Sequence, residues 1–189
     1  MDFITQLPKS HGLSAIMVVT DRLTKYAHFI GLPGGFTAES VARSFVKEIC
    51  RLHGLPTKIV SDRDPVFMSR FWRDLFKLQD TTLATSSAYH PQTDGQTEVV
   101  NRCLEDYLRC FVAENQTTWA EFLPWAELHY NTSWHSSIRL TPFEAVYGRP
   151  PPKIVNYIPG ASKVTEVDDL LTKRTTLMAQ LRINLLKAR

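Results

Sequence analysis

Three carboxylates occupy positions from which they could hold a divalent metal ion. Asp2 lies on the first extended segment, Asp62 follows the short apolar run 58–61, and Glu98 opens a helical segment. Asp62 therefore follows a predicted buried strand, and open α/β sheets place their ligand sites at the carboxyl ends of strands. Carboxylate oxygens are the ligands that Mg²⁺ prefers. A chain with 19 Asp and Glu residues offers some acids at such places in any case, so position alone leaves a structural role open.

The helical segment that begins near Gly95 presents Glu98 on a polar face. At 100° per residue, this face continues within about 40° through Arg102, Glu105 and Arg109. An apolar stripe lies on the opposite side, formed by Val100, Leu104, Tyr107, Leu108 and Phe111. A carboxylate beside arginines on an exposed face suits a metal ligand next to a phosphate path.

Composition indicates one globular, soluble, intracellular domain. The chain has 189 residues, of which 43% are hydrophobic and 22% charged, which excludes wholesale disorder. Its longest apolar run, 15–19, is far below the roughly 20 residues of a membrane span. Asp2 and Pro8 interrupt any signal peptide, and no targeting signal is visible.

Bulk charge does not single out a nucleic-acid-binding protein. The formal net charge is +3, and the basic excess lies in residues 151–189, with 7 Lys and Arg against 3 Asp and Glu. The three cysteines include no C-x-x-C pair, which argues against disulfides or a cysteine zinc site. Cys103 and Cys110 fall seven residues apart in a helical pattern, so we expect them to be buried as small apolar residues.

The hydrophobic pattern predicts strands first and helices later. The runs 13–20 and 26–32 predict a hairpin, and a helix follows from Thr37 to about Gly54. The rest of the first half is predicted to form a strand at 58–61, a helix at 67–78, a short strand at 81–84 and a mobile loop at 85–95. This order predicts a mixed α/β sheet.

The second half is predicted to be helical. After the segment from Gly95 comes a helix over 119–130, bent or restarted at Pro124. A capping box at Thr141 opens a short helix, and the run 148–152 resembles a linker. A last amphipathic helix, about 167–188, extends beyond the compact domain, so we divide the chain into a core, 1–152, and a linker with a helix, 153–189.

The chain resembles the catalytic core of an integrase of gypsy-class long-terminal-repeat retrotransposons. The resemblance is carried by MDFITQLPKS, VVTDRLTKYAHFI, HGLPTKIVSDRDPVF, AYHPQTDGQTEVVNR and WAEFLPWAELHYNTSWHSSIRLTPFEAVYGRPP, and it covers about residues 1–152. The 35 residues between Asp62 and Glu98 match the spacing in the DDE signature of that family. The resemblance implies a ribonuclease-H-like mixed β-sheet of about five strands, flanked by helices, with a C-terminal extension helix.

The resemblance also implies a catalytic and metal-binding triad of Asp2, Asp62 and Glu98. Three such carboxylates can hold two Mg²⁺ or Mn²⁺ ions roughly 4 Å apart for an in-line phosphoryl displacement. The implied enzyme, a polynucleotidyl transferase and endonuclease, processes the 3′ ends of the element and transfers them into target DNA. No glycine-rich loop that ends in Lys-Ser or Lys-Thr occurs, so nucleotide hydrolysis of the phosphate-loop kind is excluded.

The resemblance implies two kinds of partner: DNA, both as the ends of the element and as the target, and further copies of the chain. It implies no membrane partner, and it implies that the protein acts in the nucleus. The residues that match DNA-end contacts of related integrases are Tyr89, His90, Gln92, Gln96, Asn101 and Arg102. Stacking by Tyr89 and phosphate or base pairing by Arg102 would suit DNA. Ordinary loop and surface roles remain open for all six.

Some features depart from the family pattern. Asp2 follows Met1 directly, so we expect a truncated first strand, and Asp80 stands where a turn glycine is expected. These departures keep an alternative open, a catalytically inactive or domesticated remnant that binds nucleic acid or protein partners. A free-standing nuclease of the same fold, without strand transfer, is a third possibility.

Overall fold

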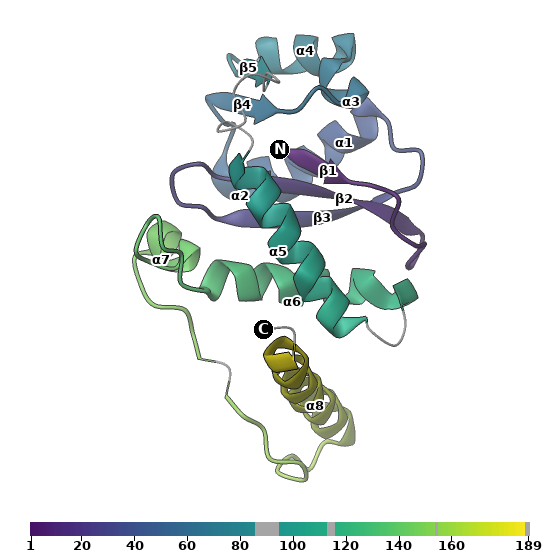
Figure 1. Ribbon diagram of the computed structural model, residues 1–189, viewed down its shortest axis with the longest axis vertical. Coiled ribbons are helices and arrows are strands. Elements are labelled where there is room, and N and C mark those ends of the chain that lie inside the picture. The colour runs from purple at the N-terminus through teal and green to yellow at the C-terminus, as the bar shows by residue number, and fades with distance from the viewer. Residues whose placement is uncertain (86–94, 113–115, 154, 188–189) are drawn as a thin grey trace.

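The computed structural model describes residues 1–85, 95–112, 116–153 and 155–187 (Figure 1). Strands dominate the first half and helices the second, as the pattern predicts. The elements of the first half are β1 (Asp2–Ile4), β2 (Leu13–Thr20), β3 (Ala27–Pro33), α1 (Ala38–Phe45), η1 (Val46–Cys50), α2 (Arg51–His53), β4 (Lys58–Ser61), α3 (Pro65–Met68), α4 (Arg70–Lys77) and β5 (Thr82–Thr85). Those of the second half are α5 (Gly95–Phe111), η3 (Gln116–Thr118), α6 (Trp119–Thr132), α7 (Pro142–Tyr147) and α8 (Thr165–Lys187).

The five expected strands form two ladders. β2 lies between β1 and β3 and pairs antiparallel with both, and β4 pairs parallel with β5. The ladders meet where β1 begins, because the Met1 ammonium donates to the Val60 carbonyl oxygen at 2.7 Å. Phe3, on β1, also stacks on Phe67 of α3, with ring centroids 4.6 Å apart. The start of β1 therefore lies beside the end of β4.

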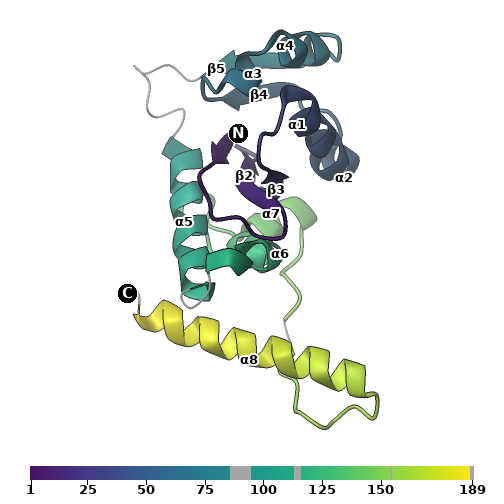
Figure 2. The same ribbon diagram turned by 90° about the vertical axis from the view of Figure 1, so that its right-hand side faces the viewer.

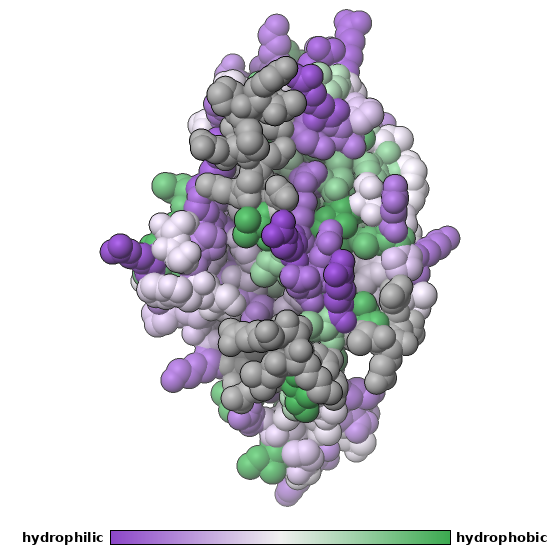
Figure 3. All heavy atoms as spheres, in the orientation of Figure 1, coloured by the Kyte–Doolittle hydropathy of each residue, from purple (hydrophilic) through white to green (hydrophobic). Residues whose placement is uncertain are grey.

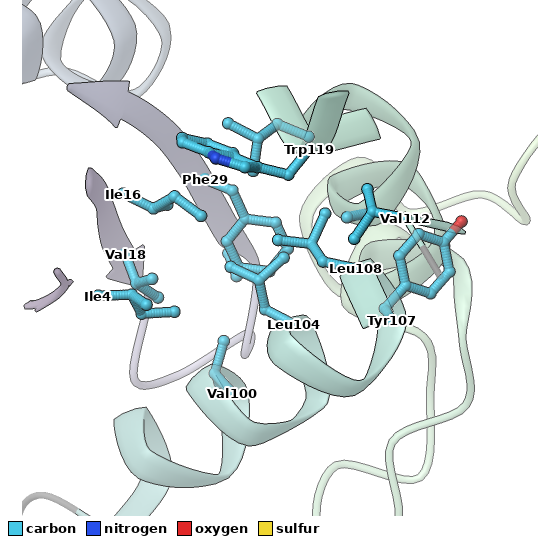
Figure 4. Packing of buried hydrophobic residues seen from close by; sticks show 13 residues of the cluster. Ile4, Ile16, Val18, Phe29, Val100, Leu104, Tyr107, Leu108, Val112 and Trp119 are labelled. Atoms are coloured by element: carbon cyan, nitrogen blue, oxygen red, sulfur yellow. The ribbon is translucent and has the colours of Figure 1, made fainter. Parts of the chain in front are cut away.

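Two apolar clusters cover the opposite faces of β2. Ile16 and Val18 belong to the cluster toward α5 and α6, and Met17 belongs to the cluster toward α1 and α4. Figure 4 shows the first cluster, in which side chains from the sheet and from α5 interdigitate. Its labelled members are Ile4, Ile16, Val18, Phe29, Val100, Leu104, Tyr107, Leu108, Val112 and Trp119. Four members of the apolar stripe predicted for this helix are thus in the core, and the side chain of the fifth, Phe111, lies outside the described part of the structure.

Two local expectations were wrong. The helix predicted over 67–78 begins earlier and is broken, because the Ser69 side chain accepts from the Trp72 amide and caps a new helix, α4. Cys103 is exposed on α5, whereas Cys110 packs against the first cluster. Of the bend or restart expected at Pro124, the restart does not occur, because α6 runs through the proline. The capping box at Thr141 is confirmed, with Glu144 as its partner.

Side-chain hydrogen bonds fasten α6 to β3 across the α5 side of the sheet. The Asn131 amide accepts from the Ala27 N–H and donates to the Ala27 carbonyl, at 2.9 and 2.8 Å. One oxygen of Glu127 accepts from the Phe29 amide at 2.9 Å, and the other lies 3.0 Å from His28 Nδ1. His28 Nε2 lies 2.9 Å from His53 Nε2, so the chain of contacts continues to α2.

The last helix lies apart from the sheet layers. Figures 1 and 2 show α8 below α6, joined to α7 by an extended stretch. α8 contacts α5, and Met178 packs against the first apolar cluster. Leu170 remains 68% exposed, and Val167 and Ile183 are also exposed. Among the described residues, no helix combines the length and apolarity needed to cross a membrane.

We predict that acid destabilises the fold through His53. Partial burial lowers the pKa of His53, and the neighbouring His28 lowers it further, although Asp21 and Glu127 act in the opposite direction. The unfolded chain, with a His pKa near 6.5, therefore takes up the proton first as the pH falls. The free energy of unfolding should be greatest above about pH 6.5 and decline below it, as measured by urea unfolding across that range.

His53→Gln should make this decline shallower, and the control Leu52→Gln, at an exposed position of the same helix that does not titrate, should leave its slope unchanged. Burial also lowers the pKa of His129 and His135, so part of the decline should survive in His53→Gln. Equal slopes for wild type and His53→Gln would refute the assignment to His53.

Candidate metal and nucleic-acid site

Three elements that carry the predicted carboxylates meet at one end of the sheet. Asp2 begins β1, Asp62 directly follows β4, and the hydrogen bond from Met1 to Val60 holds these two strand ends together. The first turns of α5 complete the arrangement, because the side chain of Asn101 reaches Asp2. The start of β1, the end of β4 and the first turns of α5 therefore adjoin.

Asp2 is held by two N–H donors. Its Oδ1 accepts from the Phe3 amide at 2.8 Å, and its Oδ2 accepts from Asn101 Nδ2 at 2.6 Å. A carboxylate can only accept, so the amide nitrogen of Asn101 must face it. Within the described part of the chain no Lys or Arg forms an ion pair with Asp2, so its negative charge is oriented but not neutralised.

Asp62 lies in the turn that leads from β4 into α3. Its Oδ1 accepts from the Asp64 amide at 3.2 Å, and its carbonyl oxygen accepts from the buried Ser61 hydroxyl at 3.2 Å. Asp64 in turn caps α3, since its Oδ1 accepts from the Val66 amide at 2.8 Å. The position of Asp62 is thus fixed by the local turn on both sides.

Asn101 has a contact that sequence reasoning missed. It was expected as a DNA contact, and the structure places it against Asp2. Its Oδ1 is buried and has no hydrogen-bond partner among the described residues. The signal was present in the sequence, because Asn101 follows Glu98 by three residues and such positions share one side of a helix.

The other predicted residues are only partly visible. Glu98 and Gln96 belong to α5 by their backbone, and their side chains lie outside the described part of the structure. Tyr89, His90 and Gln92 lie outside the described residues altogether. Arg102 is exposed on α5, where Figure 3 shows hydrophilic side chains along the outer face, as the helical wheel predicts.

A cavity of about 540 Å³ lies nearby, and neither Asp2 nor Asp62 lines it. It lies beside Met1, between the ends of β2 and β4, and its polar lining includes Thr20, His28, His53 and Lys58. The carboxylates instead occupy the open edge where the two ladders meet. An open edge suits a long polymeric substrate better than an enclosed pocket does.

The oxygen donors fit a hard divalent cation. Each carboxylate has about four lone-pair sites, and the hydrogen bonds above use only some of those on Asp2. The orphaned Asn101 Oδ1 adds a buried oxygen beside them. No group of three His, Cys, Asp or Glu side chains suited to a metal occurs in the part of the chain that the structure describes, which leaves out the Glu98 side chain.

Relatives of the chain are retrotransposon polyproteins. The Tf2-3 and Tf2-4 transposon polyproteins of Schizosaccharomyces pombe are each 37% identical to it over 166 residues. This match covers 88% of the chain, and the chain spans 12% of the length of these relatives. No protein-family model matches the chain.

Solved structures of similar fold are retroviral integrases. The HTLV-2 integrase catalytic core in complex with magnesium, in its trimeric form, matches with a TM-score of 0.60 at 14% identity, over 76% of this chain and 93% of that one. The integrase chain of a simian T-cell lymphotropic virus intasome, in complex with the PP2A subunit B56 gamma, matches at 0.65 and 17% identity, over 86% and 59%. The catalytic core of BIV integrase matches at 0.57 and 24% identity, over 76% and 91%.

The match to the relatives extends over 166 of the 189 residues, and the fold match extends over most of each catalytic core. The chain is therefore a homologue of the Tf2 retrotransposon polyproteins and has the ribonuclease-H-like fold of integrase catalytic cores.

Proposed function

We propose that the chain is the catalytic core of a DNA integrase that processes the 3′ ends of an element and joins them to target DNA. The observation that carries the proposal is the hydrogen bond from Asn101 to Asp2, which fastens the helix of Glu98 to the start of β1. The 37% identity to the Tf2 polyproteins supports it. The proposed metal ligands are Asp2, Asp62 and Glu98, the triad that the family resemblance implies.

The chemistry requires little of the protein beyond position and charge. A pair of Mg²⁺ or Mn²⁺ ions, when bound, would activate the attacking hydroxyl and stabilise the leaving oxygen. The chain holds Asp2 between two N–H donors and Asp62 in a capped turn, so neither carboxylate has to be ordered on binding. Magnesium is bound in the HTLV-2 neighbour, which supports a divalent cation at this edge.

The proposed DNA contacts lie on and before α5. Tyr89, His90, Gln92 and Gln96 would meet the DNA end, and the exposed Arg102 would pair with a phosphate. For Asn101 we propose a positioning role toward Asp2, in addition to any contact with DNA. The retained carboxylates and their ordered contacts favour catalysis over an inactive remnant.

We further propose that the chain is divided at about residue 152 and acts in the nucleus as a homo-oligomer. Residues 1–152 hold both apolar clusters apart from Met178, and α8 exposes apolar side chains that a second copy would cover. The HTLV-2 core occurs in dimeric and trimeric forms. Chromosomal target DNA places the activity in the nucleus.

Substitution of a triad member should abolish metal-dependent cleavage while the fold survives. Asp62→Asn and Glu98→Gln each remove one negative charge from the proposed ligands, so cleavage of a DNA end in Mn²⁺ should fall below detection. The metal-induced rise in melting temperature should also vanish, since a ligand at about 100 times its Kd stabilises the native state by about 2.7 kcal/mol. Asp106→Asn, an exposed residue on α5, is the matched control and should behave as wild type. Full cleavage by either triad variant would overturn the assignment.

Loss of the Asn101 amide should weaken the site more than the fold. In Asn101→Ala the Asp2 carboxylate loses one of its two donors, and removal of such an outer contact typically costs about 10- to 100-fold in metal affinity or activity. Mn²⁺ dependence of cleavage and a metal-free thermal melt measure the two effects separately. If Asn101→Ala has the Mn²⁺ dependence of wild type, Asn101 does not position Asp2.

The exposed apolar side chains of α8 should contribute to self-association. Leu170→Asp should reduce the oligomeric state of the full chain, measured by light scattering, because Leu170 is among the most exposed apolar residues. Thr176→Asp places the same charge at an exposed polar position of the same helix and is the control. A chain that ends at Pro152 should also be less associated, and unchanged oligomeric state in both Leu170→Asp and the shortened chain would contradict the role of α8.

A further inference from the structure

A cluster of cations and exposed aromatic and aliphatic side chains lies beside the site, outside the residues already assigned to DNA. It is formed by the turn between β2 and β3, the loop 133–141, and the end of α7 with the residues that follow it. Figure 1 shows the β2–β3 turn and α7 on the same side of the molecule, and the ring contact between Tyr26 and Tyr147 agrees. We call it the turn–loop face, and its members are Arg22, Leu23, Lys25, Trp134, Arg139, Leu140, Tyr147 and Arg149.

Printed contacts connect the three segments. The Tyr26 and Tyr147 ring centroids lie 6.1 Å apart, which joins the turn to α7. Arg22 and Leu23 of the turn line one cavity together with Val146 of α7. Arg149 lies over the Phe143 ring of α7 at 5.7 Å. The loop 133–141 leads directly into α7, whose N-cap is Thr141. The turn and the loop therefore both adjoin α7.

The charge of the face is positive and available to a partner. Arg22 and Arg139 are exposed, and neither forms an ion pair within the described part of the chain. Two carboxylates nearby, Asp21 and Glu144, are turned into their own segments: Asp21 accepts from the hydroxyl and amide of Thr24 at 2.6 and 3.0 Å, and Glu144 accepts from the hydroxyl and amide of Thr141 at 2.8 and 3.0 Å. Within the described part of the chain, neither acid forms an ion pair with Arg22 or Arg139.

Trp134 is presented by an ordered turn. It is 68% exposed, although the loop beside it is held by hydrogen bonds from the His135 amide to the Leu140 carbonyl and from the Arg139 amide to the His135 carbonyl, both at 2.9 Å. A large ring left in water next to arginines is the combination by which proteins hold nucleic-acid strands, through base stacking and phosphate contacts.

We infer that the turn–loop face binds DNA, with Arg22 and Arg139 on phosphates and Trp134 stacked on a base. The inference rests on the proposed function, since it supplies a second contact for the same substrate. The face lies at the same end of the sheet as the carboxylates. Asp2 pairs with Val18, β2 ends two residues later at Thr20, and the β2–β3 turn follows. DNA that crosses the carboxylates thus reaches this face without leaving that end of the molecule.

Binding of fluorescent DNA in EDTA tests the inference apart from metal-dependent cleavage. The double variant Arg22→Glu with Arg139→Glu should weaken binding and lower the slope of log K against log salt by about two, measured between about 50 and 200 mM salt. Arg43→Glu with Lys47→Glu makes the same charge change on α1 and η1 and should leave that slope unchanged. Trp134→Ala should weaken single-strand binding roughly tenfold, and Trp134→Phe should retain much of it.

Because Arg139 has a φ of 52°, Arg139→Gly removes the cation without backbone strain and should show a weakening in the same direction. Wild-type affinity in these variants, while wild type binds DNA and cleaves it with Mn²⁺, would overturn this inference alone. Wild-type DNA affinity with lost self-association would make the face a protein interface and would overturn it as well. If the wild-type chain neither binds nor cleaves DNA, the proposed function falls with it.

Discussion

Burial of β2 on both faces is the constraint on which the rest of the structure depends. Ile16, Met17 and Val18 are fully buried in succession, so adjacent residues face different apolar clusters. Full burial of such side chains contributes about 1.5–3 kcal/mol each, and a strand of this kind needs helices on both sides. α5 and α6 therefore lie on one face and α1 and α4 on the other.

The candidate site follows from that layering. α5 covers the face of β2 to which Val18 belongs, and the register pairs Val18 with Asp2. Asn101, near the start of the helix, thereby meets Asp2 at the start of β1. The apolar stripe of α5 packs against the sheet and so fixes the position of the helix. The charged residues of α5 whose side chains the structure describes lie on its other face, which is exposed to solvent. Packing and chemistry are divided between two sides of one helix.

Features that depend on neighbours in sequence were predictable, and those that depend on neighbours in space were not. The Thr141 capping box and the alternation of β2 follow from local spacing. The Asn101–Asp2 bond joins residues 99 apart, and only the register of the whole fold brings them together. The same holds for Glu127 and His28, also far apart in the chain. The triad itself came from family resemblance, because spacing alone left a structural role open.

Completion of the first apolar cluster has a consequence for synthesis on the ribosome. The sheet residues of this cluster lie between Ile4 and Phe29, and their helical cover comes from residues 100–126. At about 5–20 residues per second, roughly 100 further residues take about 5–20 s to be made. The other face of the sheet is covered sooner, because the helical residues that pack against it are residues 41–76. A nascent chain thus carries a half-covered sheet for seconds, and this is the interval in which a chaperone would be needed most.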